Sequence, residues 1–204
     1  MPRKASFDRK KAIETVMHKM WRDGYHRSSV KSLSELLGIT RSSFYNAFSS
    51  REALFKEVLT LYTEYTPLTK LMLAKAGDPI LPLFTAALRE LCSMRAKDGR
   101  HTGCLAMNSI AELCETELNG TSNELSCHLQ QQLSLSNERI ELLLTWAQQQ
   151  NEIPEITDLQ DLALALTNLF IGLNIMSKAI PQEDKLWAAA KTTLVALGLY
   201  SSKQ

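Results

Sequence analysis

The chain has 204 residues, of which 45% are apolar and 22% charged, and its formal net charge is +1. This composition is ordinary for a globular protein with a real core, and it excludes a low-complexity or disordered chain. The charge is uneven, because residues 1–57 carry 12 Lys or Arg against 6 Asp or Glu, whereas the other 147 carry 11 against 16. The N-terminal part is therefore suited to meet phosphate, and the remainder is not.

Glycine, proline and cysteine usage narrows the fold class further. Only 8 Gly and 6 Pro occur, and no alternating β-branched run is present, which predicts an all-α fold of about nine helices. No apolar run of about 18 residues and no signal-peptide core stand out, so we expect a cytoplasmic protein without membrane contact. The four cysteines are Cys92, Cys104, Cys114 and Cys127. They lack metal-ligand spacing, so we expect them to be thiols and expect no metal or cofactor.

The first predicted helix runs from Asp8 to about Arg22 and places an apolar stripe on one face. A loop at Gly24–Ser28 follows, and either Ser28 or Ser29 is expected to cap the next helix. The stripe consists of Ile13, Val16, Met17, Met20 and Trp21. This helix is expected to cover the hydrophobic core of the segment that follows.

The segment from Ser29 to Phe55 predicts two short helices joined by a tight turn. Gly38 follows an apolar pattern of helical spacing, at a place where a left-handed residue ends a helix. Thr40 is expected to cap a second helix that begins at about Arg41. The apolar positions of the two helices are Val30, Leu33, Leu36, Leu37, Phe44, Tyr45 and Phe48.

In a helix-turn-helix, the second helix enters the major groove of DNA and presents its first residues to base edges and phosphates. Hydroxyl groups and the helix N-terminus suit phosphate oxygens, while Arg41 and Asn46 have the donor geometry to read a base. The residues that we expect to contact DNA are Lys31, Thr40, Arg41, Ser42, Ser43, Tyr45, Asn46 and Arg51. Two helices around a glycine also occur in proteins that bind no nucleic acid.

The same segment resembles the DNA-binding domain of TetR-type transcriptional regulators. The matching residues are Leu33-Ser34, Leu37-Gly38-Ile39-Thr40, Tyr45, Phe48 and Arg51-Glu52-Ala53-Leu54. Two positions depart from the family pattern, because Ala47 stands where His is usual and Ser42 where Gly or Ala is common. The resemblance implies a three-helix DNA-binding domain at residues 1–55 and an effector-binding and dimerisation domain at residues 56–204.

Further helices are expected after the motif. Ser49 with Glu52 is interpreted as a capping box for a helix that reaches to about Lys75, bent or interrupted at Pro67. Asp78 and Pro79 are interpreted as the cap and first residue of the next helix. Later helices are predicted near 103–114, from 121 or 122 to about 150 after a turn at 119–120, at 158–179 and at 183–199.

The helix at 158–179 is apolar on nearly all sides. A monomer would expose too much of it, so we expect one face in the core and another against a partner chain. The resemblance implies the same, namely a homodimer through about residues 158–199. A twofold dimer predicts a palindromic operator in double-stranded DNA, with half-sites about 34 to 36 Å apart or a multiple of that spacing.

The resemblance also implies a small effector that binds the second domain and releases DNA. The candidate lining residues are Tyr62, Tyr65, Phe84, Leu88, Met107, Trp146, Phe170 and Met176. Residues of these types are more often plain core. The segment from Gly103 to Glu112 resembles a Gly-Cys-Leu-x-x-Asn-x-x-x-Glu pattern of one TetR subgroup, some members of which respond to electrophiles or oxidants.

Within that segment, Cys104 lies at a predicted helix start near Arg100 and His101, a setting that favours the reactive thiolate. The alternative for Cys104 is inert packing. Asn108 and Glu112 lie four residues apart on one helical face, either as a polar wall of the pocket or as a structural pair.

Other functional classes fit the sequence less well. An enzyme would need a base held by a third group, and the sequence shows no nucleophile elbow, metal motif or phosphate loop. A helical scaffold without DNA binding would explain residues 58–204, but not the ordered aromatic motif or the basic first 57 residues. A thiol-based electrophile or oxidant sensor remains the alternative within the regulator class. Repressor or activator, operator sequence and effector stay open.

Overall fold

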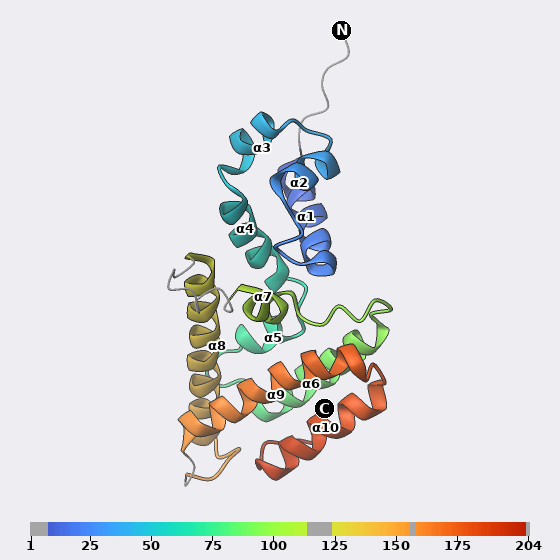
Figure 1. Ribbon diagram of the computed structural model, residues 1–204. Coiled ribbons are helices and arrows are strands. Elements are labelled where there is room, and N and C mark those ends of the chain that lie inside the picture. Colours follow the sequence, from blue (N-terminus) through green and yellow to red (C-terminus); the bar gives the residue numbers. More distant parts are fainter. Residues whose placement is uncertain (1–7, 114–123, 156–157, 203–204) are drawn as a thin grey trace.

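A computed structural model describes residues 8–113, 124–155 and 158–202, and every regular element in these ranges is a helix (Figure 1). The all-α prediction is confirmed, with ten helices in the described ranges rather than about nine. They are α1 (Arg9–Asp23), α2 (Val30–Leu37), α3 (Arg41–Phe48), α4 (Arg51–Thr63), α5 (Leu68–Met72), α6 (Ile80–Lys97), α7 (Leu105–Leu113), α8 (Glu124–Gln149), α9 (Leu159–Ala179) and α10 (Glu183–Ala196).

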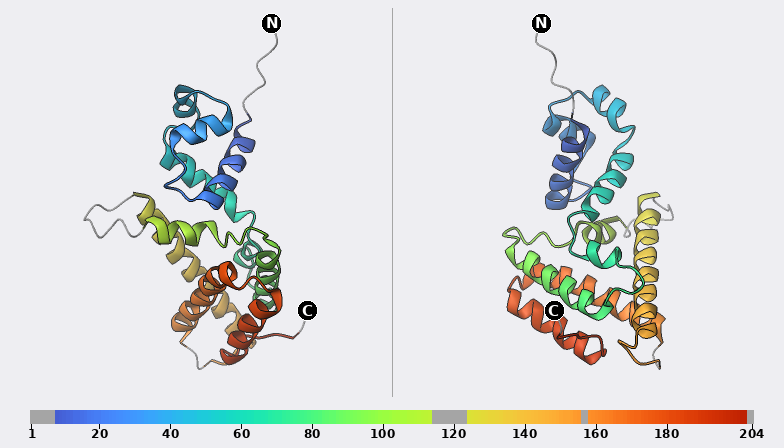
Figure 2. Two further views of the ribbon diagram at one scale, coloured as in Figure 1. Left: turned by 45° about the vertical axis from the view of Figure 1, so that its right-hand side comes forward. Right: turned by 180° about the vertical axis from the view of Figure 1, so that it is seen from behind.

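The helices form an elongated molecule with a small unit at one end. Helices α1 to α4 make this unit, and α6, α9 and α10 lie at the opposite end (Figure 1). Helix α8 runs along one side of the larger body, while α7 lies between the body and the small unit (Figure 2). We call α1 to α4 the head and the remaining helices the body.

The helix-turn-helix forms as its sequence predicts. Gly38 adopts the left-handed conformation with φ of 65°, and its amide donates to carbonyls of the last turn of α2. The Thr40 side chain accepts from the amide of Ser43, and Ser29 caps α2 by accepting from Ser32. Both helix ends at the turn are therefore capped by local contacts, while Ile39 packs against the core of the head.

The start of α4 differs from the predicted capping box. Ser49 ends α3 with a left-handed φ of 63°, so Ser50 becomes the cap and accepts from the amide of Ala53 at 3.0 Å. Glu52 accepts instead from the hydroxyl of Tyr25 at 2.9 Å. The interruption near Pro67 is confirmed, since α4 ends at Thr63 and the short α5 is separate.

The predicted Asp78 cap of α6 is also wrong. The Asp78 carboxylate accepts from the amide of Lys75, in the loop before it. The free amides of Ile80 and Leu81 donate to the carboxylate of Glu152, at 2.8 and 2.7 Å. A residue 72 positions away in sequence therefore caps α6, which no local pattern reveals.

Two hydrophobic clusters hold the molecule together. One joins the head to α7 and the beginning of α8, through Leu105, Leu113, Leu125 and Leu129. The other lies among α5, α6, α8, α9 and α10. Helix α4 runs unbroken across residues 55 and 56, so head and body are connected by a rigid helix and a shared core rather than by a linker.

Helix α9 is long and apolar enough to cross a membrane by length and composition alone, with a mean hydropathy of 1.4. The expectation that no apolar run reaches about 18 residues is therefore wrong. Residues such as Leu166 and Leu173 pack in the body core, while Leu164 and Ile175 stay about half exposed. The same helix also buries two polar residues, Asn174 and Ser177, which form hydrogen bonds within the fold.

Candidate nucleic-acid interface and effector cavity

Helix α3 separates an anchored face from a polar exposed one. Phe44 and Phe48 are buried, with ring centroids 5.3 Å apart, and fix the helix to the head core. On the other side the exposed residues are Thr40, Arg41, Ser42, Ser43, Tyr45 and Asn46. Lys31 of α2 is exposed as well. Seven of the eight residues expected to contact DNA therefore lie at the surface of the helix-turn-helix.

Arg51, the eighth, is engaged within the head. Its guanidinium lies 4.0 Å from the ring centroid of Tyr25 and its Nε 3.7 Å from a Glu52 carboxylate oxygen. Burial, and then the hydrogen bond to Glu52, raise the pKa of Tyr25 to about 12, so its hydroxyl stays protonated and keeps donating. Arg51 thus braces the α1–α2 loop against α4.

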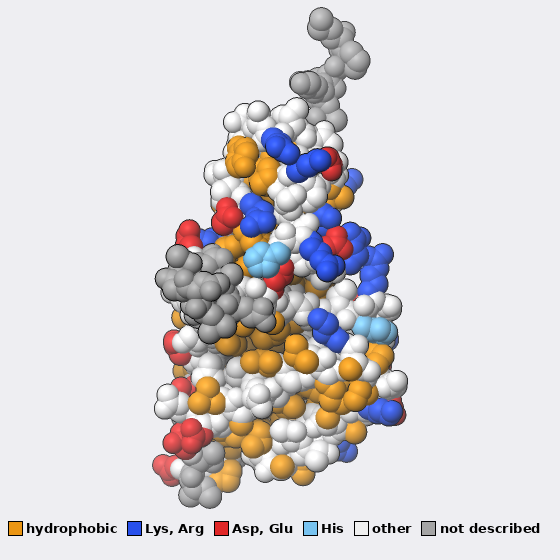
Figure 3. Space-filling model, in the orientation of Figure 1, with side chains coloured by type: hydrophobic (Ala, Val, Ile, Leu, Met, Phe, Trp, Pro, Cys, Tyr) orange, Lys and Arg blue, Asp and Glu red, His pale blue; other side chains and the backbone are white. Residues whose placement is uncertain are grey.

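Charge and apolar surface are distributed differently over the two regions. In Figure 3, Lys and Arg side chains are prominent over the head and its junction with the body, whereas the lower body shows broad apolar areas. The exposed apolar side chains of α9 and α10 include Leu164, Ile175 and Val195, and at least half of the surface of each is exposed.

A cavity of about 370 Å³ lies among α4, α5, α7, α8 and α9. Four predicted effector residues line it, namely Tyr62, Cys104, Met107 and Phe170. Thr63, Thr66, Thr69 and Thr167, which the sequence did not single out, add hydroxyl groups to its wall. Because its residues come from positions 62 to 174, no local motif outlines it.

The other six predicted residues do not line this cavity. Phe84 and Leu88 are fully buried core residues of α6, and Met176 packs against the same core. Trp146 lies under the guanidinium of Arg139, 4.9 Å from its ring centroid. The exposed Tyr65 donates its hydroxyl to Glu14. Asn108 donates to the carbonyl of Thr102 and accepts from Lys178.

Arg95 of α6 is buried directly behind the cavity wall, with 2% of its surface exposed. Its Nε donates to the Asn174 side-chain oxygen at 2.7 Å, and another guanidinium nitrogen donates to the Tyr62 hydroxyl at 3.1 Å. Both acceptors belong to residues of the cavity wall. Arg95 recurs at helical spacing with the buried Leu88 and Leu91, a signal that could have identified it in the sequence.

Cys104 lies on the cavity wall immediately before α7, within hydrogen-bonding reach of Tyr62. Burial, and then the neighbouring Cys104 sulfur, raise the pKa of Tyr62 well above its ordinary value. Arg100, which is expected near Cys104, lines an outer cleft. Cys92 differs from Cys104, because burial raises the pKa of its thiol to about 11 and leaves it protonated within the core. Cys114 lies outside the described residues.

A second chamber of about 290 Å³ adjoins the cavity. The two share Tyr62, Met107 and Leu133 among their lining residues. The second chamber also reaches Leu59 and Leu129, which belong to the hydrophobic cluster of the head. A molecule that extends through both chambers would touch the cores of head and body.

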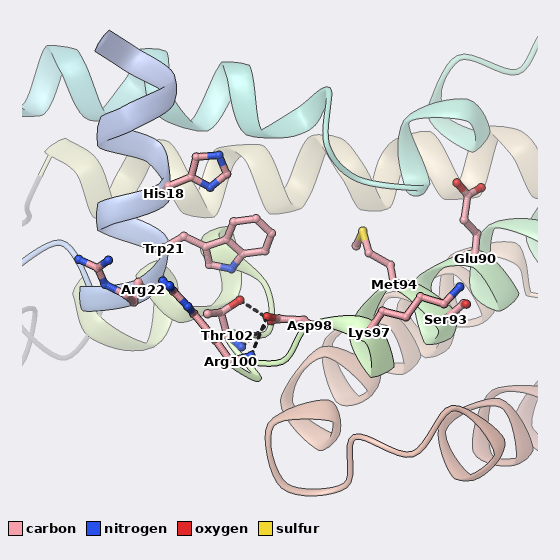
Figure 4. A pocket seen from close by; sticks show the side chains of 10 residues that line it. All are labelled: His18, Trp21, Arg22, Glu90, Ser93, Met94, Lys97, Asp98, Arg100 and Thr102. Atoms are coloured by element: carbon pink, nitrogen blue, oxygen red, sulfur yellow. Dashed lines mark hydrogen bonds between the residues drawn. The ribbon is translucent and has the colours of Figure 1, made fainter. Parts of the chain in front are cut away.

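Figure 4 shows a third hollow, an open cleft of about 700 Å³ between α1 and α6. Trp21 and Met94 face it, and charged residues such as Lys97 and Arg100 stand at its edge. Asp98 accepts from the amides of Arg100 and Thr102 and from the Thr102 hydroxyl. This cleft is more open to solvent than the cavity, and we assign no effector to it.

Helix α7 joins the cavity to the head at both of its ends. Before its first turn, the Gly103 carbonyl accepts from the Trp21 indole at 3.0 Å. In its last turn, the Glu112 carboxylate accepts from the amides of Tyr25 and His26 at 2.9 and 2.6 Å. A Cβ at Gly24, where φ is +87°, would lie only 3.0 Å from that carboxylate. Glu112 is therefore a structural contact to the head rather than a cavity wall residue.

Comparison with known proteins shows the family. Residues 15–58 match the N-terminal model of the bacterial regulatory proteins of the tetR family, and residues 82–193 match the tetracyclin repressor-like C-terminal domain. The chain belongs to the TetR family. It is a helix-turn-helix transcriptional regulator. The predicted partners agree with what this family binds, namely double-stranded DNA, a second copy of the chain and a small effector. Proteins of the family are in general soluble and cytoplasmic, and the relatives found are regulators rather than enzymes.

Individual relatives agree with this TetR assignment. The chain is 27% identical to the HTH-type transcriptional repressor ComR of Escherichia coli (strain K12) over 192 residues, which cover 92% of this chain and 88% of ComR. BdcR of the same organism is 28% identical over 106 residues, 51% of this chain and 53% of BdcR. A cysteine mutant of the TetR family regulator CifR was solved with 26-bp operator DNA and has the same fold. The TM-score is 0.79 at 23% sequence identity, and the match covers 95% of this chain and 98% of CifR.

Proposed function

We propose that this TetR-family protein is a cytoplasmic homodimeric repressor that binds a palindromic operator and is released by a small effector. The exposed polar face of α3 carries the proposal, because the opposite face of this helix is buried in the head core through Phe44 and Phe48. The relatives ComR and BdcR are repressors by name, and CifR was solved on operator DNA. Catalysis has no part in this function.

The DNA contacts divide by chemistry. Arg41 and Asn46 are assigned to base edges, while Lys31 and the hydroxyls of α3 are assigned to phosphates. Tyr45, 51% exposed, stands beside them and completes the same face. Arg51 is assigned a supporting role, since its guanidinium already contacts Tyr25 and Glu52. Residues 1–55 act as the DNA-binding part and 56–204 as the effector and dimer part.

Dimerisation is assigned to the outer face of α9 and α10. Leu164, Ile175 and Val195 are exposed there although each is large and apolar. Two copies that pair these faces around a twofold axis would bury them and place two α3 helices on one side of the assembly. The distance between the two half-sites should then equal about one helical turn of DNA or a small multiple of it.

Release by an effector is assigned to the cavity among α4, α7, α8 and α9. An effector shifts the protein toward a DNA-incompetent arrangement only if it binds that arrangement more tightly. Helix α7 provides the physical connection, because Cys104 and Met107 line the cavity while Glu112 holds the α1–α2 loop of the head. A displacement of α7 would move the head with it.

A reactive effector is the second candidate. Cys104 lines the cavity within reach of the Tyr62 hydroxyl, so an electrophile that enters the cavity would meet a thiol. Operator affinity measured with and without a small electrophile, in the parent and in Cys104→Ser, tests this directly. An unchanged response in Cys104→Ser would remove the thiol mechanism and leave a non-covalent effector.

Selection of bound sequences from a random DNA pool, at a stated salt concentration, tests the main proposal. The full-length protein should enrich a palindrome with half-sites about one helical turn apart or a multiple of it. Enrichment of no sequence would contradict operator binding, and enrichment of a single asymmetric site would contradict the twofold arrangement.

A further inference from the structure

The buried guanidinium of Arg95 is the least expected feature of the body. It has no ion-pair partner among the described residues, and its two side-chain contacts are the neutral Asn174 and Tyr62. The aromatic ring of Trp21 lies 5.7 Å away on another side. A buried cation without an anion is costly, so a negative or strongly electron-rich group placed nearby would be stabilised.

The nearest carboxylate that interacts with this charge, Asp98, compensates it only from a distance and forms no ion pair with it in the described part of the chain. Although burial works in the opposite direction, hydrogen bonds from Thr102 and the Arg100 amide, and then the charge of Arg95, lower the pKa of Asp98. The Asp98 carboxylate is occupied by those hydrogen bonds and makes none to Arg95 in the described residues. The Cys104 thiol interacts with the same Tyr62 hydroxyl that accepts from Arg95.

The contacts of Arg95 decide what the cavity wall can offer a ligand. Because the Tyr62 oxygen and the Asn174 side-chain oxygen both accept from Arg95, these two side chains are left with donors for the cavity. Tyr62 retains its hydroxyl proton, which lies within reach of the Cys104 sulfur, a weak acceptor that a ligand oxygen in the cavity can replace. Asn174 uses one N–H on the Phe170 carbonyl at 2.7 Å and retains the other. The rest of the wall is largely apolar, with Met72, Leu133, Ile140 and Phe170 among its residues.

We infer that the cavity recognises a mainly apolar molecule that carries one acidic or acceptor oxygen group, best as a carboxylate, and that Tyr62, Asn174 and Arg95 form its polar subsite. The inference rests on the proposed role of this cavity as the effector site. The oxygen group accepts from Tyr62 and Asn174, the charge of Arg95 favours its anionic form, and the apolar part fills the space toward the adjoining chamber. A molecule with a cationic or purely donating head group is rejected by the same three residues.

Three probes of equal chain length separate these features. Octanoate offers an anionic acceptor, 2-octanone a neutral acceptor and octylamine a cationic donor. Binding to the full-length dimer is measured by calorimetry, without DNA. The expected order of affinity is octanoate, then 2-octanone, with octylamine at least about tenfold weaker than octanoate.

Two variants test the subsite, and one variant controls for changes elsewhere on the wall. Tyr62→Phe removes the donor with little change of shape, and octanoate affinity should fall about tenfold. Asn174→Asp still accepts from Arg95 but neutralises its charge, so octanoate should lose more affinity than 2-octanone. Met107→Leu changes an apolar residue of the cavity wall without adding or removing a donor or a charge, and it should leave the order of the three probes as it is. Thermal melting confirms that each variant is folded.

The outcomes decide the inference separately from the proposed function. Equal or tighter binding of octylamine, an unchanged octanoate affinity in Tyr62→Phe, or no binding of any probe would overturn the subsite. Operator affinity is measured in parallel by fluorescence anisotropy. If octanoate binds as expected but leaves operator affinity unchanged, the subsite stands and the effector role of the cavity fails.

Discussion

The head and the body place their polar side chains on opposite sides of their helices. In the head, Arg41 and Asn46 of α3 face solvent, while aromatic rings fill the interior. In the body, Arg95 and Asn174 face inward beside a cavity, while Leu164 and Ile175 face outward. The inverted pattern supports the proposal that the head meets a polar partner outside, whereas the body holds a ligand inside and meets an apolar partner outside.

The largest expected effect comes from the core of the head. Phe44→Ala removes a fully buried ring that contacts Phe48, and it should cost about 3 to 5 kcal/mol of stability. Operator binding should be lost, because α3 loses its anchor. Phe84→Ala in the body core is the matched control of equal volume. Thermal unfolding of both variants should show Phe44→Ala weakening the head first. Identical unfolding profiles would contradict a separate response of the head.

The polar face of α3 gives the next effect. Arg41→Ala should cost about 1 to 3 kcal/mol at one operator position and relax sequence preference there, because a base contact is lost. Lys31→Ala should weaken binding to all sequences alike and reduce the salt slope by about one. Competition binding over a set of single-base operator variants distinguishes the two. A uniform loss in both variants would withdraw the base-reading role of Arg41.

Glu112 tests the connection between the two regions. Glu112→Ala removes a carboxylate that accepts from two head amides, and each charged hydrogen bond contributes about 1.5 to 3 kcal/mol in such settings. Operator affinity should fall and its response to an effector should shrink. Glu112→Gln, which keeps one acceptor oxygen, should lie between Ala and the parent.

Ala111→Ser is the matched control for Glu112, since Ala111 is exposed on the same helix. It should leave both operator affinity and effector response as they are. A full effector response in Glu112→Ala would show that the coupling does not depend on the Glu112 contacts with the head.

The smallest effect is a pH dependence at Asp98. Its pKa is lowered in the folded state, so its contribution to stability is present above the unfolded pKa of about 3.9 and is lost as pH falls through the still lower folded value. Asp98→Asn should therefore be less stable than the parent at pH 7, and the difference should narrow below about pH 4. Chemical denaturation at pH 7 and pH 3 measures it. A constant difference at both pH values would contradict the hydrogen-bonded carboxylate.

The head could be predicted from the sequence because its decisive interactions are local. Gly38 and Thr40 end and begin helices through contacts within five residues, and the structure confirms both. The predicted cap at Ser49 is wrong, because Ser49 has a positive φ of 63° that ends α3, and Ser50 caps α4 instead. The exposed face of α3 then follows from helical periodicity, although its contacts with DNA stay a prediction.

The body could be predicted only in outline, because its decisive contacts join distant segments. Glu152 caps α6 from beyond α8, and Glu112 holds a loop 86 or 87 residues earlier. Large apolar residues such as Phe84 and Leu88 were candidates for the cavity but fill the core, since side-chain type does not distinguish a wall from an interior. The buried Arg95 was missed because a charged residue in a helix is usually exposed.

Sedimentation of the full-length protein, alone and with a fluorescent duplex from the selection experiment, tests the central claim most directly. A twofold dimer should sediment as a particle of twice the 22.9 kDa chain mass without DNA, and an even number of chains should bind one palindromic duplex. A monomer in solution that binds a single half-site, or a dimer that leaves the duplex unbound, would contradict it.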